Sequence, residues 1–212
     1  MKSYFQPEGE IAMEHTRSPI LDKAAVFAQT VMKDDATGHD YEHILRVRRL
    51  AERIMSHELA DPDIVILAVL LHDVDDHKLG GPGDRAERFL KENDVLEGVM
   101  NAVLEIIGSM SYSAHVAGKS VASIEGKIVQ DADRLDAIGA IGIARAFAYG
   151  GKKSRPIFVG SIDDDSSFAH FHQKLLHVAS LLNTKTAKRI AIRRHHFLKR
   201  FVKRFGEEWQ GK

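Results

Sequence analysis

Apolar residues recur along the chain at intervals of three and four, the spacing that places them on one face of an α-helix. The segment from about Asp40 is the clearest case, because its arginines and glutamate fall largely outside an apolar face. That face consists of Ile44, Val47, Leu50, Ala51 and Ile54. No segment alternates convincingly with the period of two expected for a half-buried strand, and no internal repeat is present. The pattern therefore predicts an all-α fold.

Two helix starts are marked by a capping residue followed by proline, which suits the first helical position because an N–H is not needed there. Ser18-Pro19 predicts a helix over residues 20–32, and Asp61-Pro62 predicts one from Asp63. The second helix is apolar nearly all round over residues 64–71. We therefore expect it to be central and buried.

Five further helices are predicted, joined by polar or glycine-rich connections. Their expected bounds are Asp84–Glu92, Val95–Ile107 with Asp94 as its cap, Ile124–Ala148 ended by Gly150-Gly151, Ser167–Leu182, and Thr184 to about Glu208. The expected connections are residues 79–83, 108–119 and 151–165.

The length of 212 residues allows one well-packed core, and we predict a single compact helical bundle over residues 18–211. Its core spans about 18–150, a helical extension spans about 151–211, and residues 1–17 form a flexible N-terminal extension. The apolar run 64–71 is far too short to span a bilayer. The polar N-terminus lacks the basic start and apolar stretch of a secretory signal, so we expect a cytoplasmic protein.

The composition leaves histidines and carboxylates as the candidate metal ligands. The chain has no cysteine, which excludes disulfides, thiolate metal sites and cysteine nucleophiles. Its 30 lysines and arginines balance 30 aspartates and glutamates, so net charge gives no reason to expect a nucleic-acid polymer as partner. The placement of the 12 histidines therefore carries more information than the charge does.

The adjacent pair His72-Asp73 follows the helix that is too apolar to be exposed. Neighbouring side chains reach one ion most easily where a helix ends, and a helix C-terminus also favours a cation. The pair therefore indicates a metal site. The alternative is a helix that simply enters a polar loop, with His72 bonded to a backbone carbonyl.

Two other segments carry candidate ligands. His43 lies next to the apolar face of its helix, where a lone histidine is more often a core residue than a ligand. Asp131, Asp133 and Asp136 lie within one apolar helix, and the last two share a face because they are three residues apart. Taken singly, these carboxylates are equally explained as caps or solvated charges.

Together, the order of these motifs resembles the HD-domain phosphohydrolase superfamily. The resemblance lies in His43-Ile-Leu-Arg-Val47, in His72-Asp73 after Leu70-Leu71, and in Ala132-Asp133-Arg134-Leu135-Asp136-Ala137. It implies His43, His72, Asp73 and Asp133 as metal ligands, with Asp133 favoured over Asp136. Other segments between about Ser18 and Gly211 resemble one bacterial branch of small HD hydrolases, some of which act on nucleoside triphosphates.

The implied site holds one divalent ion per chain. Two imidazoles and two carboxylates leave open positions for a water and a phosphoryl oxygen. The ligand mixture suits Mn²⁺, Fe²⁺, Co²⁺, Ni²⁺ or Zn²⁺, with Mg²⁺ as a further option, and the sequence does not choose among them.

The resemblance, in the case of Asp76, and position in the sequence, in the other cases, suggest further residues around the metal. Asp76 occupies the place of a residue that orients or deprotonates the attacking water, although a loop or capping carboxylate is the alternative. Lys78 and Arg134 flank metal ligands and are candidate phosphate-binding cations with a catalytic role, or else surface charges. His39 and His115 are candidate substrate-binding residues, although His39 also suits a helix start and His115 a polar loop.

Two basic regions remain. Arg145, Lys152, Lys153 and Arg155 surround Gly150-Gly151 and are candidates for binding a polyphosphate, although a solvated basic loop explains most of them. The basic segment 185–204 repeats apolar residues at helical spacing, which predicts a surface helix packed on the domain. A homodimer contact or an anionic partner is the alternative for that helix.

The sequence thus predicts a metal-dependent phosphohydrolase whose partner is a small phosphorylated molecule, most simply a nucleotide. The enzyme would cleave that nucleotide in the manner of a nucleoside triphosphate pyrophosphohydrolase. The alternatives are a 5′-nucleotidase that acts on monophosphates and a catalytically idle sensor of metal or nucleotide. A sensor has no need of Asp76, so the presence of that residue favours an enzyme.

Overall fold

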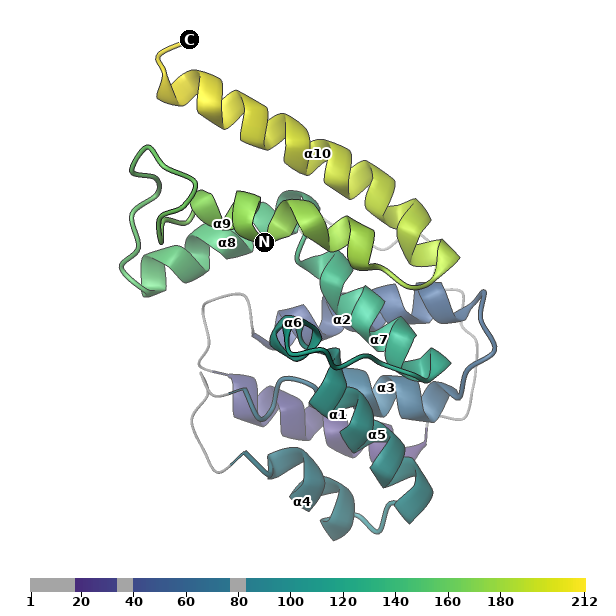
Figure 1. Ribbon diagram of the computed structural model, residues 1–212. Helices are drawn as coiled ribbons and strands as arrows, with labels where there is room; N and C mark the ends of the chain where they lie inside the picture. The colour runs from purple at the N-terminus through teal and green to yellow at the C-terminus, as the bar shows by residue number, and fades with distance from the viewer. Residues whose placement is uncertain (1–17, 34–39, 77–82) are drawn as a thin grey trace, which may run out of the picture.

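The computed structural model describes residues 18–33, 40–76 and 83–212 (Figure 1). Its regular elements are all helical, and no strand occurs among these residues, so the predicted all-α class is confirmed. The predicted extension 1–17, His39, Lys78 and residues 79–82 of the predicted loop lie outside the described residues. The helices are α1 (Pro19–Met32), α2 (Tyr41–Met55), α3 (Pro62–Leu71), α4 (Arg85–Glu92), α5 (Glu97–Met110), α6 (Tyr112–Val116), α7 (Ile124–Asp136), α8 (Gly139–Lys152), α9 (Ala169–Gln173), the 3₁₀ helix η2 (Leu175–Leu181) and α10 (Lys185–Trp209).

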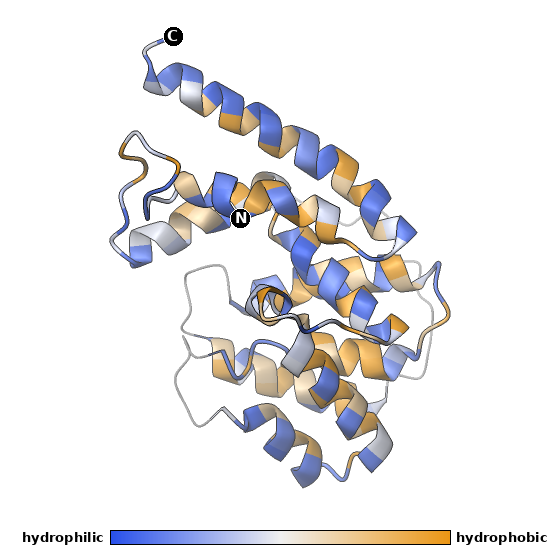
Figure 2. Cartoon of the chain, viewed as in Figure 1, coloured by the Kyte–Doolittle hydropathy of each residue, from blue (hydrophilic) through white to orange (hydrophobic). Residues whose placement is uncertain are grey.

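Helix α3 lies at the centre of the core, as its apolar sequence predicts. It packs against α1, α2, α5 and α7, and every residue from Val65 to Leu71 is buried. Figure 2 shows the corresponding ribbon as almost entirely hydrophobic. The Asp61 carboxylate accepts hydrogen bonds from the amides of Asp63 and Ile64 and so caps the helix as expected. Burial of this apolar surface fixes the place where the chain turns at His72.

Helices α2 and α7 form the most extensive helix pair of the fold. The predicted apolar face of α2 is buried, with Ile44, Val47 and Ile54 fully inaccessible to solvent. Asp40 caps the helix, because its carboxylate accepts a hydrogen bond of 2.9 Å from the His43 amide. The pairing therefore holds the first turn of α2 against the last turn of α7.

The prediction for residues 95–119 is wrong in its boundaries. Helix α5 begins at Glu97, and Asp94 is not its cap but a turn residue with φ of 52°. The helix continues to Met110, and the expected loop also contains α6. The Ser111 hydroxyl caps this short helix by accepting a hydrogen bond of 3.0 Å from the Ala114 amide. Local capping thus gives helix where serine and glycine content predicts a loop.

The helix predicted over residues 124–148 is in fact two helices. The chain breaks between α7 and α8 at Gly139, whose φ of +80° suits glycine. Gly150-Gly151 does not end α8, which continues to Lys152. A Cβ atom at Gly150 would lie 1.9 Å from Ser167 Oγ, so this glycine permits a close approach of the following connection.

The C-terminal extension packs on the core. The segment predicted as one helix over 167–182 is divided into α9 and η2, whereas α10 closely follows its predicted bounds and packs against α7, α8 and η2. Asp131 is fully buried and joins α7 to the start of α10, because its carboxylate accepts hydrogen bonds from the amides of Asn183 and Thr184. An aromatic cluster fills the space between α8, α9 and α10, and its Phe168 and Phe205 rings stack with centroids 4.0 Å apart. Among the described residues, no helix combines the length and apolar character needed to cross a bilayer.

Candidate metal centre

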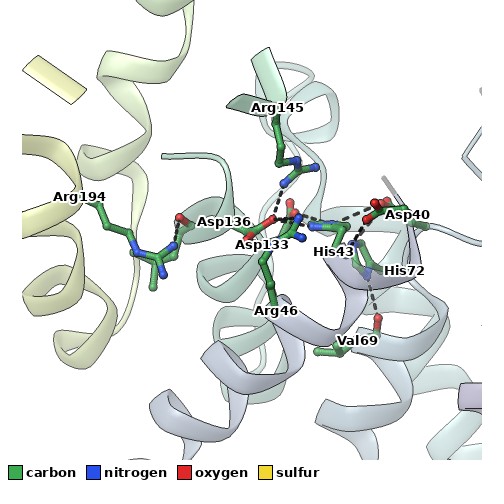
Figure 3. Close-up of polar contacts among 11 residues, drawn as sticks. Asp40, His43, Arg46, Val69, His72, Asp133, Asp136, Arg145 and Arg194 are labelled. Carbon is green, nitrogen blue, oxygen red and sulfur yellow. Dashed lines mark hydrogen bonds and ion pairs between the residues drawn. The ribbon is translucent and has the colours of Figure 1, made fainter. Parts of the chain in front are cut away.

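Three helix ends bring the candidate ligands together (Figure 3). His43 lies in the first turn of α2, His72-Asp73 follows the last residue of α3, and Asp133 lies in the last turn of α7. The α2–α7 and α2–α3 packing described above therefore assembles residues that are up to 90 positions apart in the sequence.

The candidate ligand atoms lie at distances that suit one shared ion. His43 Nε2 is 3.5 Å from both Asp73 Oδ2 and Asp133 Oδ1, and His72 Nε2 is 3.5 Å from Asp73 Oδ1. Ligand atoms of His43, His72 and Asp73 all lie within 4.8 Å of one another. Donors bound to a common ion at about 2.1 Å would be about 3 to 3.5 Å apart. The arrangement can therefore hold a divalent ion after small adjustments.

The His72 ring is oriented by the backbone of α3. Its Nδ1 lies 2.8 Å from the Val69 carbonyl oxygen, so Nδ1–H donates and the Nε2 lone pair faces the candidate ligands. Nε2 is buried and makes no hydrogen bond to any described residue. Burial lowers the pKa of His72, but the carboxylates of Asp73 and Asp133 outweigh it and raise the pKa above its ordinary value. The backbone bond that we considered as an alternative to metal binding is present, and it leaves the second nitrogen available.

Asp136 holds His43 from the side opposite to the candidate ion. His43 Nδ1 lies 2.8 Å from Asp136 Oδ2, and the same carboxylate accepts hydrogen bonds from Arg46 Nε at 2.9 Å and Arg145 Nη1 at 2.7 Å (Figure 3). Burial raises the pKa of Asp136, but the hydrogen bonds from His43 and Arg46 and the nearby positive charges hold it well below its usual range. Asp136 is therefore ionised and fixes the His43 tautomer.

Sequence reasoning considered Asp136 only as an alternative ligand and missed this positioning role. The signal was present, since Asp133 and Asp136 lie three residues apart on one helical face. In the structure, Asp133 faces the His43 Nε2 side, whereas Asp136 binds the Nδ1 side.

The remaining predicted site residues lie in different surroundings. Asp76 is half-buried in the turn after α3, where its amide donates a hydrogen bond of 3.0 Å to the Asp73 carbonyl. Arg134 is buried, and its guanidinium donates to the Leu181 carbonyl, which is a structural contact that the sequence did not reveal. His115 is exposed on α6. His39 and Lys78 belong to the part of the chain that is not described.

One neighbouring carboxylate has a structural function. Asp75 accepts hydrogen bonds from the amides of Arg85 at 2.8 Å and Ala86 at 3.0 Å, and Arg85 returns a bond to the Val74 carbonyl. Asp75 thus caps α4 from the turn that carries the candidate ligands, and it holds that turn in place.

Fold and site together define an all-helical protein with a partly buried His-His-Asp centre. A family model described as HD domain matches residues 40–138, which include all the candidate ligands. The chain is also 39% identical over 195 residues to YpgQ of Bacillus subtilis, which is described as uncharacterized, and the match covers 90% of this chain and 94% of YpgQ. The chain belongs to the HD-domain family.

Solved structures agree with this assignment. A protein of Bacillus thuringiensis described as an HD-superfamily hydrolase is 40% identical, with a TM-score of 0.71 over 91% of this chain and 97% of that chain. The YpgQ chain of Bacillus subtilis, in its crystal structure in complex with ADP, is 36% identical in sequence to this chain. The two structures align with a TM-score of 0.74 over 89% of this chain and 97% of that chain.

Proposed function

We propose that the protein is a divalent-metal-dependent phosphohydrolase that acts on nucleotides, in the manner of a nucleoside triphosphate pyrophosphohydrolase. The observation that carries the proposal is the centre formed by His43, His72 and Asp73, with Asp133 beside it. Two neutral imidazoles and two carboxylates suit a divalent ion that keeps open positions.

Each residue has a distinct task in this proposal. His43 and His72 present their Nε2 lone pairs because Asp136 and the Val69 carbonyl occupy their Nδ1 atoms. When bound, a divalent ion would supply a water of lowered pKa and offset charge on the phosphoryl group. Asp76, which follows Asp73 by three residues, would orient that water and accept its proton.

The relative YpgQ supports the choice of a nucleotide as the substrate. YpgQ has been crystallised with ADP, and this chain matches YpgQ over nearly its whole length. The α-helical HD fold and the metal centre alone fit any phosphate ester or anhydride. Nucleotide cleavage in this chain therefore rests on the ADP complex of that protein together with the site residues.

A substrate screen tests the proposal. The purified protein is incubated with nucleoside tri-, di- and monophosphates and with Mn²⁺, Co²⁺, Ni²⁺, Zn²⁺ or Mg²⁺, and the products are identified by chromatography. We expect a monophosphate and pyrophosphate from a triphosphate, and loss of the reaction on chelation or in His72→Ala. The control His196→Ala removes an exposed histidine of α10 and should retain activity.

Two other outcomes distinguish the alternatives. Release of orthophosphate from monophosphates would identify a 5′-nucleotidase. Tight nucleotide binding without turnover under any metal would favour the sensor and overturn the enzymatic proposal.

A further inference from the structure

A cavity of about 410 Å³ opens between α8, residues 155–167 and α9. Its wall begins at Ala137, the residue directly after Asp136. The polar and charged side chains that line it include Arg145, Tyr149, Arg155, Asp165, His170 and Lys174.

Arg145 links this cavity to the metal centre. Its Nη1 donates a hydrogen bond of 2.7 Å to Asp136 Oδ2, and Asp136 in turn binds His43 (Figure 3). The guanidinium carries five N–H donors, so the contact with Asp136 leaves others for a ligand in the cavity. A small molecule that contacts Arg145 would therefore be connected through Arg145 and Asp136 to His43, a candidate metal ligand.

The lining carries an excess of positive charge. Arg145, Arg155 and Lys174 are cations contributed by α8, the following connection and the end of α9. Asp136 opposes Arg145 from outside the lining, and the carboxylate within the lining is Asp165, which pairs with Arg155 at 3.6 Å but is 92% exposed. A long pair with such an exposed partner contributes little, so an anionic ligand can replace Asp165 at low cost.

His170 adds a neutral polar group to the same wall. Burial, together with the charges of Lys174 and Arg155, lowers the pKa of His170 to about 4. Its imidazole is therefore neutral near pH 7 and can donate one hydrogen bond without adding charge. The two nearby cations Lys174 and Arg155 give this wall a positive local field.

We propose that this cavity binds the phosphate chain of the substrate, and that it selects chains of two or more phosphates over a single phosphate. The inference rests on the proposed function, because it concerns the substrate of that same centre. The cations lie on three successive elements, so one phosphate group meets fewer of them than a chain does. Guanidinium groups also pair with phosphate oxygens in a bidentate manner.

Binding of inorganic tripolyphosphate and orthophosphate tests the proposal without hydrolysis. Calorimetry is done on the full-length protein, both metal-loaded and after chelation. We expect tripolyphosphate to bind at least about tenfold more tightly than orthophosphate in the chelated protein, because more charge-assisted hydrogen bonds form. Equal affinities for the two anions in the chelated protein would overturn the proposal.

Variants locate the binding to the cavity. Arg155→Gln should weaken tripolyphosphate binding by about tenfold, whereas Asp165→Asn should strengthen it by removing the competing carboxylate. Lys188→Ala is the matched control, since it removes an exposed cation of α10 that does not line the cavity. If Arg155→Gln and Lys188→Ala bound tripolyphosphate equally well, the assignment would be contradicted. A substitution of Arg145 would not isolate the cavity, because Arg145 also donates a hydrogen bond to Asp136 at the metal centre.

A nucleotide series separates the phosphate chain from the nucleoside. ATP should bind the chelated protein with an affinity similar to that of tripolyphosphate, and AMP and adenosine much more weakly. If adenosine bound as tightly as ATP, the cavity would hold the nucleoside and the proposal would fail. Because these measurements need no turnover, they remain informative if the hydrolase proposal fails.

Discussion

His43 and Asp136 form a buried hydrogen bond of 2.8 Å between Nδ1 and Oδ2, which directs His43 Nε2 toward Asp73 and Asp133. Asp136 is 1% exposed and is also held by Arg46 and Arg145, so its position is determined from three sides. An imidazole whose Nδ1–H is held by a carboxylate has a fixed tautomer and a more basic Nε2. The contact therefore prepares His43 to bind a cation.

Asp136→Asn should weaken metal affinity about 10- to 100-fold while the chain stays folded. The amide keeps the shape of the side chain but loses the charge that favours Nδ1–H donation from His43. Metal titration by calorimetry measures the affinity, and far-ultraviolet circular dichroism verifies the fold. An unchanged affinity would mean that Asp136 serves only to neutralise Arg46 and Arg145.

Substitution of the metal ligand His72 and substitution of the proposed general base Asp76 should affect metal content and activity differently. His72→Ala should lose metal and activity together, because Nε2 is a direct ligand in the proposal. Asp76→Asn should keep the metal and lower kcat by about 10²- to 10⁴-fold, the usual contribution of a general base. Elemental analysis after dialysis, combined with steady-state kinetics, separates the two effects. Near-normal turnover in metal-loaded Asp76→Asn would remove Asp76 from the mechanism.

The helices that the sequence predicts well are those whose pattern and burial agree. The apolar face of α2 and the all-round apolar character of α3 are local properties, and both elements lie where the pattern indicates. The sequence at position 139 is ambiguous, because a glycine within a helical pattern permits either a weakened helix or a break. A Cβ atom added at position 139 would lie 3.1 Å from Cγ of Arg194, so the break occurs where α10, which no local pattern relates to this position, packs closely.

In the candidate site, too, local motifs predict some features, whereas others depend on contacts between distant parts of the chain. The motifs in the sequence identify His43, His72, Asp73 and Asp133 as candidate ligands, and the fold brings them together. The surroundings of Arg134 depend on the carbonyl of Leu181, which is 47 residues away, so spacing alone could not identify them. The cavity likewise combines Arg145 with residues of a distant segment, and its charge becomes apparent only after folding.

Arg134→Ala should destabilise the protein by about 1 to 3 kcal/mol, because it removes the donor to the Leu181 carbonyl and a buried side chain. Urea unfolding at pH 7.5 measures the free energy of unfolding. Arg193→Ala, which removes an exposed arginine from α10, is the matched control and should change this free energy little. A raised KM with unchanged stability in Arg134→Ala would instead restore the phosphate-binding role predicted from the sequence.

His170 should make the free energy of unfolding depend on pH. Its pKa is about 4 in the folded protein and about 6.5 in the unfolded chain, so the unfolded state binds the proton more readily. The stabilisation from the neutral imidazole is fully present above about pH 6.5 and is lost as the pH falls toward 4. Between pH 7.5 and 5, the chelated wild-type protein should lose up to about 2 kcal/mol more than His170→Asn in urea unfolding.

The comparison between wild type and His170→Asn cancels the other titrating groups. His72, whose pKa is raised in the folded protein, contributes with the opposite sign, but it does so in both proteins. Nuclear magnetic resonance of the imidazole gives a direct control, because Lys174→Ala should raise the pKa of His170 by removing a nearby positive charge. The rise should be partial, since burial of His170 is the larger cause and remains. If His170 titrated near 6.5 in the wild-type protein, the positive field in the cavity would be absent and this prediction would be wrong.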